Sequence, residues 1–218
     1  MGDKLCPKII LEGTRLTFKT EIAFALNEHP EVVGPRKYRY HSPLISGEWC
    51  AFTPFPWGRG LINFEPAHEE KRAMETYKTW AHLFELLYYY SWIIDRFHLS
   101  TRLYQLLYHQ KDYDFRWLEE KLVACGFHLV FMTRSAESFA AAREKRLEIS
   151  GNPQQYDHLH LFQQEQELLE KLVADSILPV IRVDISDNNV NAAVEKIVTW
   201  LKESGGLYVA EQEAGMFQ

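Results

Sequence analysis

The 218-residue sequence has few cysteines, no long basic run and no long apolar segment. Its three cysteines, Cys6, Cys50 and Cys125, are odd in number and widely spaced, so they match neither a disulfide framework nor a zinc motif. We expect buried thiols in a reducing compartment. The net charge of −6 argues against a broad electrostatic surface for duplex nucleic acid. No apolar stretch approaches the roughly 18 residues that span a bilayer, and no signal peptide precedes the first predicted strand, so a cytoplasmic location is expected.

What the sequence does contain is ordinary for a globular protein, apart from its aromatic residues. Hydrophobic residues make up 46%, charged residues 25% and aromatic residues 14% of the chain, and the last value is high. The length suits one sizeable core rather than two independent domains. We therefore predict a single domain over residues 1–218, with an insert at about 34–66 that is rich in proline, glycine and aromatic residues, and a lid at about 134–156.

Short apolar runs separated by helical patterns predict the fold. Five runs predict strands at residues 8–12, 31–34, 91–95, 128–133 and 180–184. Their apolarity is continuous rather than alternating, which is typical of parallel strands covered on both faces. Apolar residues recur every three or four positions over residues 74–88 and 190–201, which predicts helices. We expect an α/β fold with three layers, built on a doubly wound, parallel, five-stranded sheet whose ligands sit beyond the carboxyl ends of the strands.

The first predicted strand leads into a candidate phosphate-binding loop. Its layout is that of G-x-x-x-x-G-K-[ST], but Phe18 stands where the second glycine is usual. Backbone amides and a helix N-terminus at one point attract phosphate; Lys19 would reach the β- and γ-phosphates and the Thr20 hydroxyl would bind Mg²⁺. In the alternative, Gly13 is only a strand-to-helix turn and Lys19 is solvated. The predicted nucleotide-binding residues of this loop are Gly13, Thr14, Arg15, Leu16, Thr17, Phe18, Lys19 and Thr20.

Phe18 is the defect in this motif. A Cβ and a ring at this position restrict the backbone and crowd its approach to an anion. We expect nucleotide binding to survive if the ring points back into the fold.

The predicted strand 91–95 ends in Asp95 and Arg96. Asp95 would hold Mg²⁺ or accept the proton of an attacking hydroxyl, while Arg96 would grip an acceptor phosphate as a planar fork. In the alternative, the two side chains form a structural ion pair with each other.

Basic residues follow the predicted strand 128–133. Arg134 stands at the strand end, and Arg143 and Arg146 lie three apart on one helical face. Such charges would neutralise the oxygens of a transferring phosphoryl group. The alternative is a solvated helix face, because acidic residues alternate with the basic ones.

Together, the stretches ILEGTRLTFKT, IIDRFHLST and FMTRSAESFAAAREKR resemble the P-loop nucleoside and nucleoside-monophosphate kinases, most nearly the thymidylate kinase group. The resemblance extends over residues 8 to about 203 and implies a P-loop NTPase fold with ATP and Mg²⁺. It assigns the donor phosphates to the first loop, metal binding to Thr20 and Asp95, and packing of the adenine ring to the segment around Asn188. The residues that it assigns to catalysis are Lys19, Asp95, Arg96, Arg143 and Arg146.

The chain departs from this group at Phe18 and over residues 35–64. In place of a phenylalanine-proline-arginine acceptor motif it has Gly34-Pro35-Arg36-Lys37-Tyr38-Arg39. An anionic acceptor would bind the arginines, and Trp57 or Phe55 would stack on a base; in the alternative these are packed or solvated loop side chains. The predicted substrate-binding residues are Arg36, Arg39, Trp57, Arg59 and Arg96.

The sequence leads to one preferred function and two alternatives. The preferred function is an ATP-dependent phosphotransferase for a nucleoside or nucleoside monophosphate, a small-molecule enzyme without polymeric nucleic acid or membrane partners, and with a homodimer as one expected assembly. Phe18 supports the first alternative, a P-loop-like protein that binds a nucleotide or a partner without turnover. The unfamiliar segment 35–66 supports the second, a kinase for a small non-nucleotide acceptor.

Overall fold

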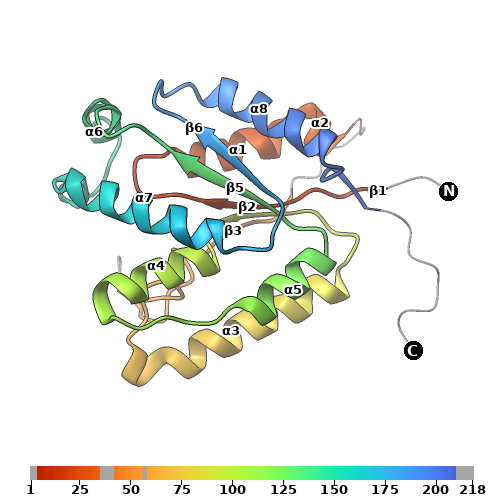
Figure 1. Ribbon diagram of the computed structural model, residues 1–218, viewed down its shortest axis with the longest axis horizontal. Coiled ribbons are helices and arrows are strands. Elements are labelled where there is room, and N and C mark those ends of the chain that lie inside the picture. Colours follow the sequence, from red (N-terminus) through yellow and green to blue (C-terminus); the bar gives the residue numbers. More distant parts are fainter. Residues whose placement is uncertain (1–3, 35–41, 56–57, 210–218) are drawn as a thin grey trace.

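The protein is a three-layer α/β structure in which helices cover both faces of a parallel sheet (Figure 1). The computed structural model describes residues 4–34, 42–55 and 58–209. The sheet has the order β3-β4-β2-β5-β6, and every neighbouring pair is parallel. Its strands are β2 (Lys8–Glu12), β3 (Leu44–Ser46), β4 (Trp92–Asp95), β5 (His128–Thr133) and β6 (Val180–Asp184). The predicted doubly wound, five-stranded parallel sheet is therefore confirmed.

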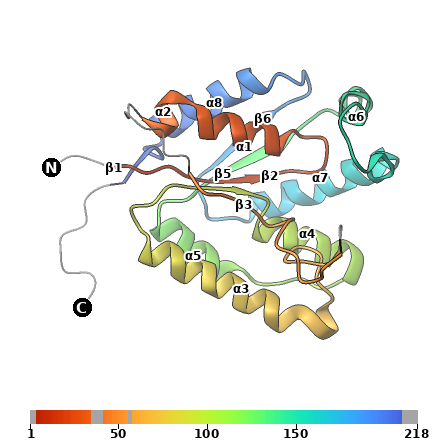
Figure 2. The same cartoon turned by 180° about the vertical axis from the view of Figure 1, so that it is seen from behind.

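The helices form one layer on each side of the sheet (Figure 2). One layer holds α1 (Lys19–Glu28), α2 (Pro30–Val33) and α8 (Val190–Glu203). The other holds α3 (Pro66–Leu86), α4 (His98–His109), α5 (Arg116–Ala124) and α7 (Leu159–Ala174). Helix α6 (Ser138–Leu147) and the 3-10 turn η1 (Pro153–Tyr156) lie beyond the carboxyl end of β5. In the described parts of the chain, no helix has both the length and the apolarity to cross a membrane.

The central strand β2 divides the core between the two layers. Ile10 packs into the cluster formed with α3, α4 and α5, whereas Ile9 and Leu11 pack into the cluster formed with α1 and α8. Successive side chains of a strand point to opposite faces, so all three of these apolar residues are fully buried. The wholly buried strands β2 and β5 coincide with the runs predicted from the sequence, and β4 begins one residue later. The edge strand β6 also coincides with its predicted run, although most of its residues are not buried.

The prediction of a strand at residues 31–34 is wrong. Residues Pro30–Val33 form the short helix α2, with proline in its first turn and the His29 ring accepting a hydrogen bond from the Glu31 amide at its start. Proline is well suited to the first turn because its missing N–H would have no intrahelical partner there. The strand at that place in the sheet is β3, which is three residues long and only partly buried.

The strand order creates a switch point beside β2. The connection that leaves β2 runs toward β3 on one side, whereas the connection that leaves its neighbour β5 runs toward β6 on the other side. Gly13 follows β2 there, and a Cβ on it would lie 2.7 Å from the Met132 carbonyl oxygen of β5. The chain after β2 therefore needs glycine in order to turn closely over its neighbour. A separate two-stranded sheet precedes β2 in the chain, in which β1 (Lys4–Leu5) pairs antiparallel with β7 (Tyr208–Val209).

Candidate functional site

The loop between β2 and α1 curls around the ammonium group of Lys19. Lys19 Nζ donates hydrogen bonds to the Thr14 carbonyl oxygen at 2.6 Å and to Thr17 Oγ1 at 3.2 Å. Leu16 and Phe18 adopt left-handed φ angles of 67° and 53°, which bend the loop back on itself. Only 6% of Lys19 is exposed. Lys19 is therefore not a solvated residue of the first helical turn.

Burial makes the Lys19 ammonium costly to hold without an anion. Its pKa is lowered from 10.5 to about 7, chiefly by burial and then by the Arg96 charge, while Asp95, Glu48 and Glu12 act to raise it. Desolvation disfavours the charged form of an amine, and a nearby negative charge restores it. A polyphosphate bound in the loop would therefore raise the pKa of Lys19.

Thr20 and Asp95 meet at the carboxyl end of β4. The Thr20 hydroxyl donates to Asp95 Oδ2 at 2.7 Å, while Asp95 Oδ1 is buried and has no hydrogen-bond partner among the described residues. A hydroxyl oxygen and an unpartnered carboxylate oxygen fit Mg²⁺, which takes one or two carboxylates and completes its shell with water and substrate phosphates. No cluster of three or more His, Cys, Asp or Glu suited to a metal occurs in the described ranges, and a site of this type does not require one.

Arg96 is held in an unusual backbone conformation by its contact with Gly47. Its φ angle is 61°, and the Gly47 amide donates to the carbonyl oxygens of Asp95 at 3.0 Å and Arg96 at 3.2 Å. A Cβ on Gly47 would lie 2.4 Å from the Arg96 carbonyl oxygen. This contact places the next residue, Glu48, with its Oε2 3.5 Å from Arg96 Nε. The Arg96 charge lowers the pKa of the Glu48 carboxyl and outweighs burial, which acts to raise it.

Glu12 fastens the start of α4 beneath this site. Its carboxylate is fully buried and accepts hydrogen bonds from the amides of Phe97 at 2.9 Å and Ser100 at 3.2 Å, and from the Ser100 hydroxyl. A carboxylate at a helix N-terminus satisfies amides that have no intrahelical partner. Glu12 therefore fixes the turn that carries Asp95 and Arg96.

The ring of Phe18 packs against the segment predicted as a lid. Only 5% of Phe18 is exposed. The charged groups of Arg134, Lys145 and Arg146 lie 5.4–5.5 Å from the centre of its ring, within the range of cation–π attraction. Arg146 also pairs with Glu21 of α1 at 2.6 Å. Helix α6 is therefore attached to the loop through Phe18 and Arg146.

The other basic residues after β5 make internal contacts. Arg143 donates to the Tyr156 carbonyl oxygen at 3.1 Å and to Asp157 at 2.8 Å, which ties α6 to the 3-10 turn. Arg134 is buried, and it donates to Asn188 Oδ1 at 2.8 Å. Burial lowers the pKa of Arg134 to about 10. Of the two predicted lid arginines, the structure places Arg146 at the loop and Arg143 away from it.

Two adjoining cavities open at this edge of the sheet. The smaller, of about 110 Å³, lies at the loop and is lined by Arg15, Leu16, Phe18, Lys19, Thr20, Glu48, Asp95, Arg96, Arg146, Gln155 and Tyr156. The larger, of about 410 Å³, has walls formed mainly by Trp49, Phe55, Ile62, Leu103, Tyr104 and Glu165. Four residues line both cavities: Arg15, Glu48, Arg96 and Gln155. The two cavities therefore share a junction at which Glu48 and Arg96 meet.

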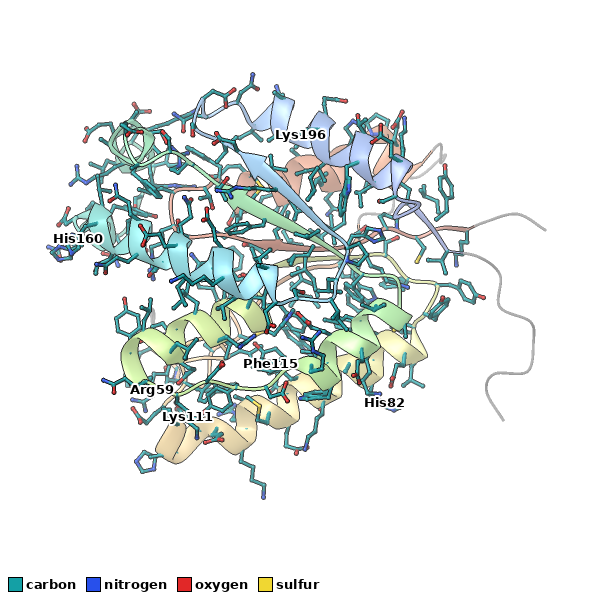
Figure 3. The ribbon with its side chains drawn as sticks, viewed as in Figure 1. Arg59, His82, Lys111, Phe115, His160 and Lys196 are labelled. Atoms are coloured by element: carbon teal, nitrogen blue, oxygen red, sulfur yellow. The ribbon has the colours of Figure 1, made fainter. Side chains whose placement is uncertain are left out.

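The predicted acceptor residues are dispersed. Arg36, Arg39 and Trp57 lie outside the described residues. Arg59, labelled in Figure 3, is half-exposed and pairs with Glu69 of α3 at 2.9 Å, and it does not line the larger cavity. Arg96 lines both cavities.

The sequence did not single out Glu12, Glu48 or Glu165. Glu48 follows β3, a strand of only three residues. The local sequence indicates this strand only through two adjacent apolar residues, Leu44 and Ile45, which precede Ser46 and Gly47. Glu165 lies within the acidic, amphipathic helix α7 and has no local signal, although its side chain is buried at the larger cavity.

Comparison with known proteins places this geometry in a known fold. No family model and no curated protein sequence matches the chain. Among solved structures, YorR from Bacillus subtilis in complex with phosphorylated GDP matches with a TM-score of 0.60 and 18% identity, over 90% of this chain and 96% of that one. Deoxyadenosine kinase from M. mycoides with bound dATP matches with a TM-score of 0.47 and 13% identity, over 89% and 99%. With its parallel sheet and flanking helices, the chain has the α/β fold of the P-loop NTPases.

Proposed function

We propose that the protein is an ATP-dependent P-loop kinase that transfers a phosphoryl group to a nucleoside or nucleoside monophosphate, in the manner of the thymidylate kinase group. The observation that carries the proposal is the loop around Lys19, with Thr20 bonded to Asp95 beside it. A buried ammonium, loop amides and a hydroxyl–carboxylate pair are the groups that phosphoryl transfer requires at the donor. The similarity to YorR, which was solved with phosphorylated GDP, also supports a nucleotide ligand.

On the donor side, the loop from Gly13 to Thr20 holds the phosphates of ATP. Lys19 neutralises the β- and γ-phosphates, and the α1 N-terminus adds its dipole. Thr20 and Asp95 are the residues that would hold Mg²⁺, which neutralises phosphate charge when bound. The adenine ring packs near Asn188, whose Oδ1 is held by Arg134.

Arginines and the lid complete the transfer site. Arg96 lies at the junction of the two cavities and Arg146 lies at the loop, so their charges stabilise the phosphoryl group as it passes in line between donor and acceptor. Arg143 holds the segment of residues 134–156 together, and this segment excludes water that would otherwise hydrolyse ATP.

The principal alternative is a protein that binds a nucleotide without turning it over. Phe18 favours it, because this residue lines the loop cavity of only about 110 Å³ where a glycine would leave more room.

Separate measurements of ATP binding and of acceptor-dependent ADP release distinguish the two functions. The acceptor panel contains nucleosides, nucleoside monophosphates, sugars and small alcohols. We expect ADP to form with at least one acceptor, and Lys19→Ala to abolish that release while the circular dichroism spectrum stays unchanged. ATP binding with no acceptor-dependent ADP would rule out the kinase and leave the binding protein.

A further inference from the structure

The ring of Phe18 is fixed at the start of α1. The backbone of Phe18 holds a left-handed φ of 53°, and its carbonyl oxygen accepts a hydrogen bond from the Ile22 amide at 2.9 Å. Only 5% of the residue is exposed, and it belongs to the core cluster that also contains Leu16 and Ile22. Side chains in a close-packed core occupy well-defined rotamers. Phe18 therefore presents a rigid aromatic surface one residue before Lys19.

Arg146 of α6 keeps most of its hydrogen-bond donors available for a ligand. Its guanidinium has one polar partner in the described parts of the chain, Glu21, at 2.6 Å. A guanidinium carries five N–H donors, and Arg146 lines the loop cavity. Arg143, by contrast, already donates to the Tyr156 carbonyl oxygen and to Asp157. Arg146 is therefore the lid arginine that can meet a phosphate in the loop cavity.

Two contacts hold the Arg146 guanidinium at this cavity. The ion pair with Glu21 joins side chains that are 20% and 32% exposed, and ion pairs near the surface restrain long side chains only weakly. The second contact is with Phe18, because Arg146 Cζ lies over its ring at 5.5 Å from the centre. Attraction between a guanidinium and a ring is stronger where water is excluded. The buried ring thus adds a second point of restraint, which limits the rotamers open to Arg146.

A loop with glycine at position 18 could not make this contact. Glycine has no side chain, so nothing at that position would reach the lid. Here the ring also lies 5.4 Å from Lys145 Nζ, so two cationic side chains of α6 gather at it. Phe18 and Arg146 line the loop cavity together with Lys19 and Thr20. The ring therefore brings positive charge of the lid to the cavity that Lys19 lines.

We infer that Phe18 is a positioning residue for phosphoryl transfer, and that it acts by holding the Arg146 guanidinium at the loop cavity. This inference rests on the proposed kinase function and gives a role to the residue that departs from the usual loop sequence. An arginine that is already in place loses little further rotamer freedom when charge develops on the transferred group. Its placement therefore contributes to kcat rather than to ATP affinity.

A double-mutant cycle tests whether Phe18 acts through Arg146. Phe18→Leu removes the ring but keeps an apolar side chain, and Arg146→Gln removes the charge. With the full-length protein, ATP, Mg²⁺ and the best acceptor of the panel, we expect Phe18→Leu to lower kcat at least about tenfold without weakening ATP binding. In the Arg146→Gln background, the same replacement should change kcat by less than about twofold.

The outcomes of this cycle are distinct. Equal effects of Phe18→Leu in both backgrounds would show a merely structural ring and overturn the inference. A higher kcat in Phe18→Leu would show that the ring obstructs the loop and would overturn it as well. Phe18→Tyr, which keeps the ring, should stay within about threefold of the unsubstituted kcat. Phe139→Leu is the matched control, because this buried ring of α6 lies 5.7 Å from Arg134 and should have the same effect with and without Arg146.

Nuclear magnetic resonance tests the contact without turnover. A proton over the face of an aromatic ring resonates upfield of its usual position. The side-chain Nε–H signal of Arg146, assigned by its loss in Arg146→Lys, should be shifted upfield in the unsubstituted protein and in Phe18→Tyr. It should return to the usual position in Phe18→Leu.

The two measurements separate failure of the inference from failure of the kinase. An unshifted Arg146 signal in a protein that forms ADP would overturn the positioning role and leave the kinase intact. No ADP with any acceptor would overturn the kinase, and with it the role of Phe18 in transfer, whatever the position of the signal.

Discussion

Replacing Phe18 by glycine restores the usual phosphate-loop sequence, yet we expect it to weaken the fold. The ring of Phe18 is 95% buried and contacts three cationic side chains, Arg134, Lys145 and Arg146. Truncation of a buried phenylalanine costs about 3–5 kcal/mol. Glycine recovers roughly 1 kcal/mol, because Phe18 holds a left-handed φ of 53° that disfavours a Cβ. The net loss of unfolding free energy for Phe18→Gly is therefore about 2–4 kcal/mol.

A comparison of Phe18→Gly with Phe18→Ala separates the two contributions. Both variants lose the ring, but only alanine retains the backbone strain, so Phe18→Ala should be less stable than Phe18→Gly by roughly 1 kcal/mol. This order is the reverse of their helix propensities. Urea denaturation followed by circular dichroism gives both values. Wild-type stability in both variants would show that the ring is not packed, and a more stable alanine variant would refute the left-handed conformation.

At a temperature where the glycine variant stays folded, its ATP affinity should equal or exceed that of the unsubstituted protein. Removing the ring adds space at the loop cavity, and glycine lets the backbone approach a phosphate more closely. Isothermal titration calorimetry measures this affinity, and a marked loss would mean that Phe18 supports the nucleotide site through the lid.

Three further predictions concern the loop and its neighbours. Bound ATP raises the pKa of Lys19 from about 7, so the complex holds more protons than the free protein above pH 7. Calorimetry at pH 8 in buffers of different ionisation enthalpy should detect the uptake of about 0.9 proton on ATP binding, and ATP affinity should fall as the pH rises toward 9. Lys19→Arg, whose guanidinium stays charged over this range, should show no proton uptake. Gly47→Ala places a Cβ against the Arg96 carbonyl oxygen and should destabilise the protein by about 1–3 kcal/mol in urea, whereas Gly151→Ala, which meets nothing within 4 Å, should be neutral. Asp95→Asn should reduce the gain in ATP affinity that Mg²⁺ produces, and an equal gain in both proteins would remove Asp95 from the metal site.

Much of the fold was predictable because its three central strands, β2, β4 and β5, are buried on both faces. The strands that carry Ile10, Ile94 and Val130 read as continuous apolar runs, and helices on both sides of the sheet require such runs. The error at residues 31–34 has a physical cause. A short apolar run such as Val32-Val33 suits a buried helical turn as well as a strand, and periodicity cannot separate the two over four residues.

Some residues of the candidate site were predictable from the sequence and others were not. Lys19 and Thr20 belong to a contiguous loop whose spacing carries the chemistry, so the sequence indicated them. Glu48 and Glu165 come together through tertiary structure, from the end of a three-residue strand and from the middle of a helix more than 100 positions later. Both carboxylates pair with the Arg15 guanidinium, and this pairing identifies them as part of the site. No local sequence pattern predicts ion pairs between residues so far apart in the chain.

Asp95 and Arg96 are consecutive residues, of which Asp95 lines the smaller cavity and Arg96 lines both. Asp95 accepts a hydrogen bond from Thr20 beside the loop, and Arg96 lies against Glu48 at the junction of the two cavities. Gly47 and the capped start of α4 hold the peptide between them, so neither residue can move independently of the other. A substitution that shifts this peptide should therefore disturb the Thr20–Asp95 contact and the Arg96–Glu48 contact together.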